Sequence, residues 1–451
     1  MQSLDELRRI IRRIETRQAP RAAAEPIERI VGGEIVKTDG GPLLVVRREY
    51  PLQHRHGCVP LDGVRQAPLD VLARVARVES TAVTAERLLF LDTETTGLAG
   101  GTGTYAFLVG VAFVEAGRLV VHQYFMRDFD DEPALLAALE PLLLRASAVV
   151  TYNGAGFDLP LLETRFVLAR RRWPATLAHL DLLRPARRVW TGWLSDCRLS
   201  TLESTVLGHA RGDDVPGAFI PLIYFDYLRS RRATPLRRVF EHNRADVLTL
   251  VALVGWFGRA LAEGANVRPE ELAGLGRLWE PVDLERALTC YRAALDGGLP
   301  EPVARWARLR LAWWEKRAAR WDAACTLWEA ARAHEIFDPR PWEELAKYHE
   351  HRARDLSAAR AIVEDALGLA RATGAASRVL DALSYRLDRL NRRLDRQPAR
   401  GWESELRPAG GPRASHTAER APNLAGSRGA PRLRRGVTSI GGLGGHVGAS
   451  I

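Results

Sequence analysis

A short apolar run that ends in two closely spaced acids constrains this chain more than any other feature. Leu89–Leu91 predicts the end of a buried strand, and Asp92 and Glu94 follow it directly. Side chains alternate along a strand, so both carboxylates point to the same face. Neighbouring carboxylates repel each other and are costly to desolvate. The pattern therefore favours a bound Mg²⁺ or Mn²⁺, which prefer oxygen ligands, and the alternative is a solvated pair of acids in a turn.

A third acid follows a second apolar run. Ala148–Val150 predicts another strand, which Asn153 and Gly154 interrupt. Asp158 then opens a helix that we expect to extend to about Arg172. The start of a helix favours a carboxylate, because the backbone N–H groups there carry partial positive charge. Asp158 is therefore either a further member of the acidic site or an ordinary helix-start residue.

A histidine and a fourth acid share one predicted helix. His242 and Asp246 are four residues apart and precede the apolar run Val247–Val251. Residues with this spacing lie on the same helix face. A histidine beside a carboxylate at such a position is either part of a functional site or a structural pair.

The order of these residues along the chain resembles that of the DEDD superfamily of 3′→5′ exonucleases, which have a ribonuclease H-like fold. The members are Asp92 and Glu94, then Asp158, then His242 with Asp246. Within that superfamily the chain is similar to the YprB-type ribonuclease H-like family from about Arg87 to Leu253. Further family-like stretches are His179–Leu183, Leu199–Glu203, Asp214–Gly217 and His242–Asp246.

The resemblance implies hydrolysis of phosphodiester bonds with two divalent ions, Mg²⁺ or Mn²⁺, about 3.5–4 Å apart. It implies that Asp92 bridges both ions and that Glu94 and Asp246 complete one of the two sites. Asp158 would contact an ion through water. His242 would take the proton from the attacking water, because an imidazole pKa near ~6.5 suits a general base.

The position of His242 departs from the family pattern. A catalytic histidine in related families usually stands one residue farther from the last aspartate, and a catalytic tyrosine has the spacing that His242 has here. His242 therefore either acts as the base from this position or only orients water.

Residues beside the acids are the predicted substrate contacts. By resemblance, Thr95, Thr96, Gly97 and Leu98 line the terminal base, and Tyr152 and Asn153 contact sugar or phosphate. The segment 97–104 is rich in glycine, which favours a flexible connection between two strands over a loop that contacts the 3′-terminal nucleotide. It lacks the Gly-Lys-Ser/Thr ending of a phosphate-binding loop. Asp181 follows a short predicted strand and either supports the site or has a structural role.

The central region predicts an α/β ribonuclease H-like fold, a mixed sheet flanked by helices. Strands are expected at Arg87–Asp92, Tyr105–Phe113, Leu119–Phe125 and Ala148–Thr151, with a helix at Glu132–Arg145 before the last of them. We assign residues 85–258 to this exonuclease-like domain. Residues 1–84 form an N-terminal accessory segment, in which 34–36 and 42–46 predict a hairpin.

An all-α, tetratricopeptide-like helical extension is predicted at residues 275–375. Leu311 and Trp314 recur 34 residues later as Leu345 and Tyr348. A period of this length is typical of tetratricopeptide helix pairs, which build a concave surface for a protein partner or for nucleic acid. The alternative is a generic helical domain.

Charge and composition indicate the partner and the compartment. The net charge of +10 in 451 residues suggests a polyanion such as single-stranded DNA or RNA. Residues 397–451 predict a disordered basic tail that either contacts phosphates or stays solvated.

The four cysteines show no paired spacing, the N-terminus does not resemble a signal peptide, and no apolar run approaches the ~18 residues of a membrane span. We therefore expect a cytoplasmic protein with no membrane contact.

Three functions are consistent with these patterns. The first is a metal-dependent 3′→5′ exonuclease. The second is a scaffold in which the helical repeats recruit a protein and the α/β domain only holds nucleic acid. The third is a structure-specific endonuclease on the same fold. Retention of all four acids favours hydrolysis over the scaffold.

Overall fold

The computed structural model describes residues 26–76, 78, 83–97, 102–174, 177–212, 214–263, 267–301, 303–332 and 337–396. Three sequence-based predictions fall outside these residues: the substrate contact at Leu98, the centre of the glycine-rich loop at 98–101, and the disordered tail at 397–451.

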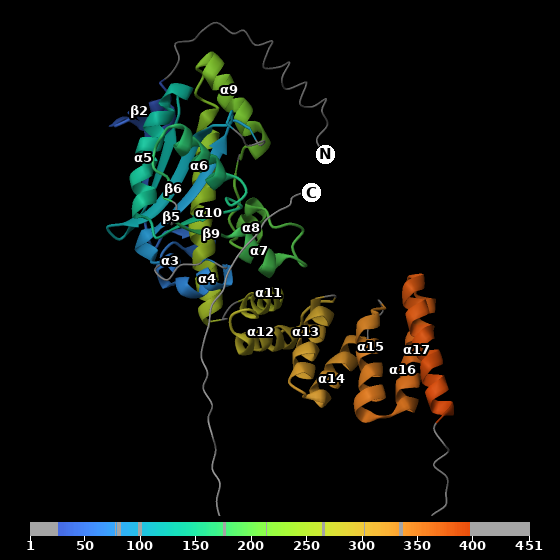
Figure 1. The fold of residues 1–451 in the computed structure, drawn as a ribbon. Coiled ribbons are helices and arrows are strands. Elements are labelled where there is room, and N and C mark those ends of the chain that lie inside the picture. Colours follow the sequence, from blue (N-terminus) through green and yellow to red (C-terminus); the bar gives the residue numbers. More distant parts are fainter. Residues whose placement is uncertain are drawn as a thin grey trace, which may run out of the picture. The chain divides into compact units, whose positions relative to one another are not determined.

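A seven-stranded mixed sheet forms the centre of the fold, with strand order β1-β2-β7-β6-β5-β8-β9 (Figure 1). Its strands are β1 (Glu34–Thr38), β2 (Gly41–Pro51), β5 (Leu88–Thr95), β6 (Ala106–Glu115), β7 (Arg118–Phe125), β8 (Ala148–Thr151) and β9 (Ala178–Asp181). The pairs from β1 to β5 are antiparallel, whereas β8 pairs in parallel with both β5 and β9. The predicted α/β fold, a mixed sheet flanked by helices, is therefore confirmed.

The N-terminal hairpin is part of this sheet. Thr38 closes the turn, because its Oγ1 donates to the carbonyl of Gly41 at 2.8 Å. Strand β2 then pairs with β7 from Leu44 opposite Phe125 to Pro51 opposite Arg118. The predicted accessory segment therefore extends the edge of the main sheet.

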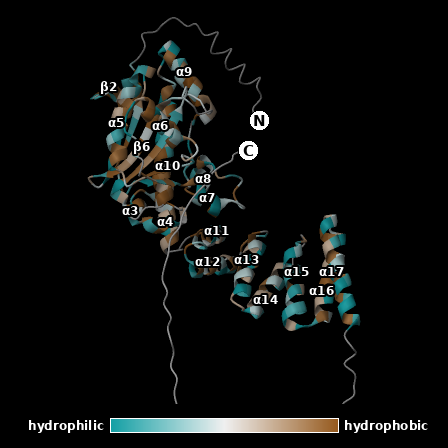
Figure 2. Cartoon of the chain, viewed as in Figure 1, coloured by the Kyte–Doolittle hydropathy of each residue, from teal (hydrophilic) through white to brown (hydrophobic). Residues whose placement is uncertain are grey.

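Alternating side chains of β5 enter two separate cores. Leu88 and Phe90 pack in the core on one side of the sheet, and Leu89 and Leu91 pack in the core on the other side. Figure 2 shows the apolar strands enclosed by helices with polar outer surfaces. Because the side chains alternate, Asp92 follows Phe90 on the first side.

Helices cover both faces of the sheet. The longer ones are α5 (Glu132–Arg145), α6 (Asp158–Leu168), α9 (Ile220–Ser230) and α10 (Leu236–Glu263). The shorter ones are α2 (Ile27–Val31), α3 (Gly63–Gln66), α4 (Leu69–Ala76), α7 (Leu183–Trp190) and α8 (Leu199–Thr205). A small hairpin of β3 (Arg55–His56) and β4 (Val59–Pro60) lies before α3, and single helical turns occur at Ala85–Arg87, Phe129–Asp131 and Gly217–Phe219.

Helix α6 is shorter than predicted. It ends at Leu168 because Arg170 adopts a left-handed conformation with φ of 54°. The backbone N–H of Arg171 then donates to the carbonyl of Phe166 at 2.9 Å, which closes the helix end.

Helix α10 is long and apolar enough, by length and composition, to cross a membrane. However, 78% of its most apolar window is buried inside the protein. Core helices pass the same length and composition test, so α10 is weak evidence for a membrane span.

A helical extension follows the α/β domain. Its helices are α11 (Pro269–Trp279), α12 (Leu284–Asp296), α13 (Val303–Arg317), α14 (Trp321–Arg332), α15 (Pro339–Tyr348), α16 (Leu356–Ala372) and α17 (Ser377–Asp395), with a π-helical turn at His349–Ala353. The recurring residues Leu311 and Leu345 are both buried. The helical nature of this region is as predicted.

The extension begins in direct contact with the α/β domain. A Cβ atom at Gly274 of α11 would lie 2.3 Å from the carbonyl oxygen of Val189 in α7, so only glycine permits this approach. The indole N–H of Trp190 donates to Oε1 of Glu271 at 3.1 Å. These contacts fix α11 on α7.

Candidate active site

The structure brings the four predicted acids together at the end of β5. Asp92 and Glu94 lie on β5, Asp158 begins α6, and Asp246 lies on α10. The hydroxyl of Thr93 donates to Oδ1 of Asp158 at 2.5 Å and so links β5 to α6. Donor atoms of Glu94, His242 and Asp246 all lie within 4.8 Å of one another.

A buried amide positions Asp92. Nδ2 of Asn243 donates to Oδ2 of Asp92 at 2.9 Å, and Nε2 of Gln123 donates to Oδ1 of Asn243 at 3.0 Å. Gly110 makes this possible, since a Cβ atom there would lie only 2.2 Å from Oδ1 of Asn243. Asn243 is fully buried. The sequence analysis did not identify Asn243 or Gln123, although Gln123 is a polar residue inside an apolar strand.

His242 is held among three carboxylates. Its Nδ1 lies 2.8 Å from Oδ1 of Asp214, and its Nε2 lies 3.3 Å from Oδ2 of Asp246 and 4.0 Å from Oε1 of Glu94. Burial opposes protonation of the ring, but the hydrogen bonds and charges of these acids raise the pKa of His242 to about 10. The raised pKa favours the protonated imidazole at neutral pH while no divalent ion neutralises the acids.

Asp92, Glu94 and Asp158 are poorly neutralised by the protein itself. Burial, with repulsion from neighbouring acids, raises the pKa of Asp92 well above its usual value. Burial also raises the pKa of Glu94 to about 8 and that of Asp158 to about 6. Asp246 differs, because His242 and Arg211 outweigh its burial and lower its pKa. Buried carboxylate oxygens that lack sufficient positive charge are the donors that a divalent ion requires, so these residues fit Mg²⁺ or Mn²⁺.

Arg211 is a residue of this site that the sequence analysis missed. Its Nη2 pairs with Oδ1 of Asp246, its Nε pairs with Oε2 of Glu203, and its Nη1 lies 3.3 Å from Oδ2 of Asp214. The acidic stretch around Asp214 was noted only as family-like, and no periodicity marks the arginine before it.

A second group of side chains that could bind a metal ion lies beside Arg211. It consists of His56, Glu203 and His209. The imidazole rings of His56 and His209 stack with their centroids 4.1 Å apart, and Thr249 donates to Oε1 of Glu203 at 2.9 Å. Arg211 and Thr249 both bind the Glu203 carboxylate, so hydrogen bonds and an ion pair already link this group to Arg211 and to α10.

Asp181 organises the loop that precedes α6. Its carboxylate accepts hydrogen bonds from the backbone N–H groups of Asn153 at 2.8 Å and Ala155 at 3.1 Å. Asn153 has a positive φ of 66°, which these bonds stabilise. Of the two roles considered for Asp181, these contacts favour the structural one.

A cleft of about 570 Å³ opens beside the acids. Among the predicted substrate contacts, its walls include Thr95, Gly97, Tyr152 and Asn153. Thr96 instead pairs with Tyr105, whose backbone N–H donates to Oγ1 of Thr96 at 3.0 Å. Phe157 also lines the cleft and is 54% exposed, which is unusual for a side chain of this size. The sequence analysis did not identify Phe157 as a candidate substrate contact.

Comparison with known proteins agrees with this geometry. Residues 89–258 match the RNase_H superfamily. The chain is also similar to the uncharacterized protein YprB of Bacillus subtilis (strain 168), with 35% identity over 214 residues, which are 47% of this chain and 52% of that protein. The chain therefore spans about half the length of this relative.

Proposed function

We propose, from the premise that residues 89–258 form a domain of the RNase_H superfamily, that this chain is a metal-dependent 3′→5′ exonuclease acting on single-stranded nucleic acid. The superfamily supports a nuclease-type function on nucleic acid. The observation that carries this proposal is the convergence of Asp92, Glu94, Asp158 and Asp246, of which Asp92 and Asp158 line a cleft.

Asp92, Glu94, Asp158 and Asp246 would hold two Mg²⁺ or Mn²⁺ ions. When bound, the ions would supply the positive charge that stabilises an in-line displacement at phosphorus. Asn243 orients the carboxylate of Asp92, and Thr93 orients that of Asp158. These hydrogen bonds keep the acids in place before any substrate arrives.

His242 is the proposed general base. The carboxylate of Asp214 accepts a hydrogen bond from Nδ1 of His242. This leaves Nε2 directed at Glu94 and Asp246. The high pKa of His242 arises from the surrounding acids, and neutralising those acids would lower it toward the range of a base at neutral pH. His242 would then accept the proton of the attacking water at Nε2.

The cleft supports binding of a strand end. Tyr152 is fixed because its hydroxyl donates to the backbone carbonyl of Cys197. Phe157 offers an exposed aromatic face next to Asp158, on which a base can stack irrespective of its identity. Thr95 and Gly97 also line the cleft.

The test is a time course on 3′-labelled and 5′-labelled single-stranded DNA and RNA with Mg²⁺, Mn²⁺ or EDTA. We expect stepwise shortening from the 3′ end that requires metal and is absent in Asp92→Asn, whose side chain is nearly isosteric. Internal cleavage would indicate the endonuclease instead. Binding without cleavage under every metal would favour the scaffold.

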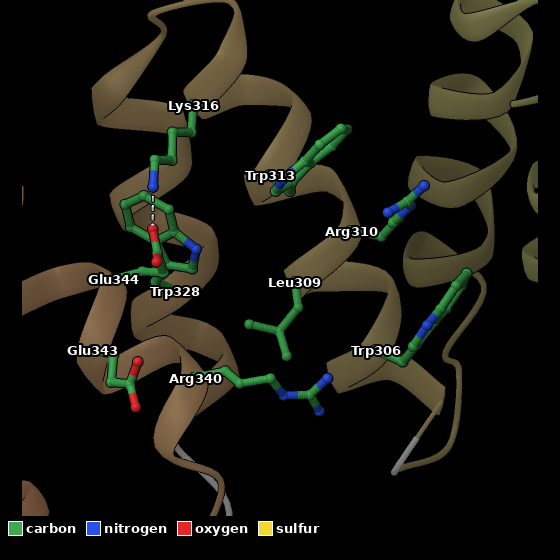
Figure 3. Close-up of a pocket in the computed structure, with 9 residues that line it drawn as sticks. All are labelled: Trp306, Leu309, Arg310, Trp313, Lys316, Trp328, Arg340, Glu343 and Glu344. Carbon is green, nitrogen blue, oxygen red and sulfur yellow. Dashed lines mark hydrogen bonds and ion pairs between the residues drawn. The ribbon is translucent and has the colours of Figure 1, made fainter. Parts of the chain in front are cut away.

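We also propose that the helical extension is tetratricopeptide-like and binds a protein partner. A hollow of about 400 Å³ lies among α13, α14 and α15 (Figure 3). Its lining combines tryptophans with both basic and acidic residues, and Trp313 is 40% exposed. Replacing Trp313 with alanine should reduce capture of a partner from lysate, and leave nuclease activity unchanged.

The proposed compartment is the cytoplasm. Cys58, Cys197, Cys290 and Cys325 are all free thiols. This is the usual state in a reducing compartment.

A further inference from the structure

One guanidinium group contacts three carboxylates at the edge of the proposed metal centre. The side chain of Arg211 is 11% exposed and lies between Asp246, Glu203 and Asp214. Asp246 is a proposed metal ligand, whereas Glu203 and Asp214 lie outside the four acids. Arg211 therefore connects the proposed metal ligand Asp246 to two carboxylates outside the metal centre.

Glu203, which pairs with the guanidinium of Arg211, is itself held in place by hydrogen bonds. Glu203 is almost fully buried, and its Oε1 lies 2.9 Å from Oγ1 of Thr249 and 3.0 Å from Nε2 of His56. His56 belongs to β3 of the N-terminal segment. Because Glu203 is fixed by two elements distant in sequence, it fixes Arg211 in turn.

Both carboxylate oxygens of Asp246 already have cationic partners. Oδ1 pairs with Nη2 of Arg211, and Oδ2 lies 3.3 Å from Nε2 of His242. A divalent ion that uses Asp246 as a ligand must share or take an oxygen from one of these groups. Arg211 cannot lose its charge at accessible pH, so its repulsion of the ion persists until it moves.

We propose that Arg211 is a positioning residue that acts as an internal counter-ion, holding Asp246 in place in the metal-free protein and competing with a divalent ion for that carboxylate. The proposal rests on the metal centre of the proposed function. It implies that the protein folds with its acidic site partly neutralised, and that ion affinity is lower than the four acids alone would provide.

The test is calorimetric titration of Mn²⁺ into the full chain, together with thermal unfolding in EDTA and in Mn²⁺. We expect Arg211→Gln to bind Mn²⁺ about tenfold more tightly than the wild type, because the substitution removes a fixed positive charge that repels the ion at Asp246. Its melting temperature should fall in EDTA and recover in Mn²⁺. Arg211→Lys keeps the positive charge but loses the planar set of N–H donors of the guanidinium. Its Mn²⁺ affinity should lie between those of the wild type and Arg211→Gln.

Unchanged or weaker Mn²⁺ binding by a folded Arg211→Gln would overturn the proposal. If this variant folds only when Mn²⁺ is present, the ion has replaced the guanidinium, as proposed. If neither Arg211→Gln nor Arg211→Lys folds under either condition, the ion does not replace the guanidinium and the proposal fails.

Asp246→Asn separates this proposal from the function on which it rests. Wild-type Mn²⁺ affinity in Asp246→Asn would refute the metal centre itself. Loss of affinity in Asp246→Asn with no change in Arg211→Gln would refute only the counter-ion.

Discussion

Replacing Asn243 with alanine should damage both stability and metal binding. The change removes the donor to Asp92 at 2.9 Å and, among the described residues, leaves Nε2 of Gln123 with the backbone carbonyl of Phe240 at 2.8 Å. A hydrogen bond to a charged group contributes about 1.5–3 kcal/mol, and a neutral one contributes about 0.5–1.5 kcal/mol. Because the side chain is fully buried, the space that it leaves adds to this cost. We expect a loss of at least about 3 kcal/mol in the free energy of unfolding, since the mid-range values for the two bonds give this sum before the cost of the space is added.

Urea denaturation in EDTA measures the stability, and Mn²⁺ calorimetry measures the second effect. Asp92 loses the group that orients it, so Mn²⁺ affinity should fall by about 10- to 100-fold. Gln123→Ala is the matched control, because it removes the donor to Asn243 without touching Asp92. It should destabilise the protein while largely preserving the affinity. An Asn243→Ala protein within about 0.5 kcal/mol of the wild type, with equal Mn²⁺ affinity, would refute the reasoning.

Three further predictions concern pH, the N-terminal segment and the cleft. Burial raises the pKa of Glu94 to about 8, so the folded, metal-free protein binds a proton that the unfolded chain releases near its ordinary pKa of 4.5. The contribution of Glu94 to stability in EDTA is therefore fully present below pH 4.5 and is lost as pH rises toward 8, and Glu94→Gln should flatten this part of the pH dependence in thermal melts. His56→Ala removes a partner of a buried carboxylate and should lower the free energy of unfolding by about 1–3 kcal/mol in urea denaturation, although this residue lies far from the acids in sequence; an unchanged midpoint would contradict that role. Phe157→Ala should weaken binding of single-stranded oligonucleotides by about 1–3 kcal/mol in fluorescence anisotropy, with unchanged Mn²⁺ affinity; equal oligonucleotide affinity would exclude stacking.

The parts of the site that sequence reasoning predicted are those with a local pattern. Asp92 and Glu94 stand at the end of an apolar run, and Asp158 stands at a strand-to-helix junction. Each position follows from the period of one element. The sheet and its flanking helices were predicted for the same reason, since alternation and helical spacing are local properties.

The parts that were missed depend on contacts between distant segments. Arg211 lies in a connection without periodicity, and its partners Glu203 and Asp246 come from two different helices. Asn243 was visible in the sequence, but its role depends on Gly110, whose missing side chain lets α10 approach the sheet. The pairing of β2 with β7 likewise could not be predicted, because an alternating pattern defines a strand but does not identify its neighbour.

The pairing of β2 with β7 also determines which fragments of this protein can be expressed without exposing a sheet edge. A fragment that begins at residue 85 would lack β1 and β2, and β7 would then become the sheet edge. Its unpaired backbone groups, from Leu119 to Phe125, would be available to strands of other molecules. The same cut would remove His56, a hydrogen-bond partner of Glu203. The isolated α/β region should therefore self-associate, and expression should begin upstream of the hairpin to yield dispersed protein.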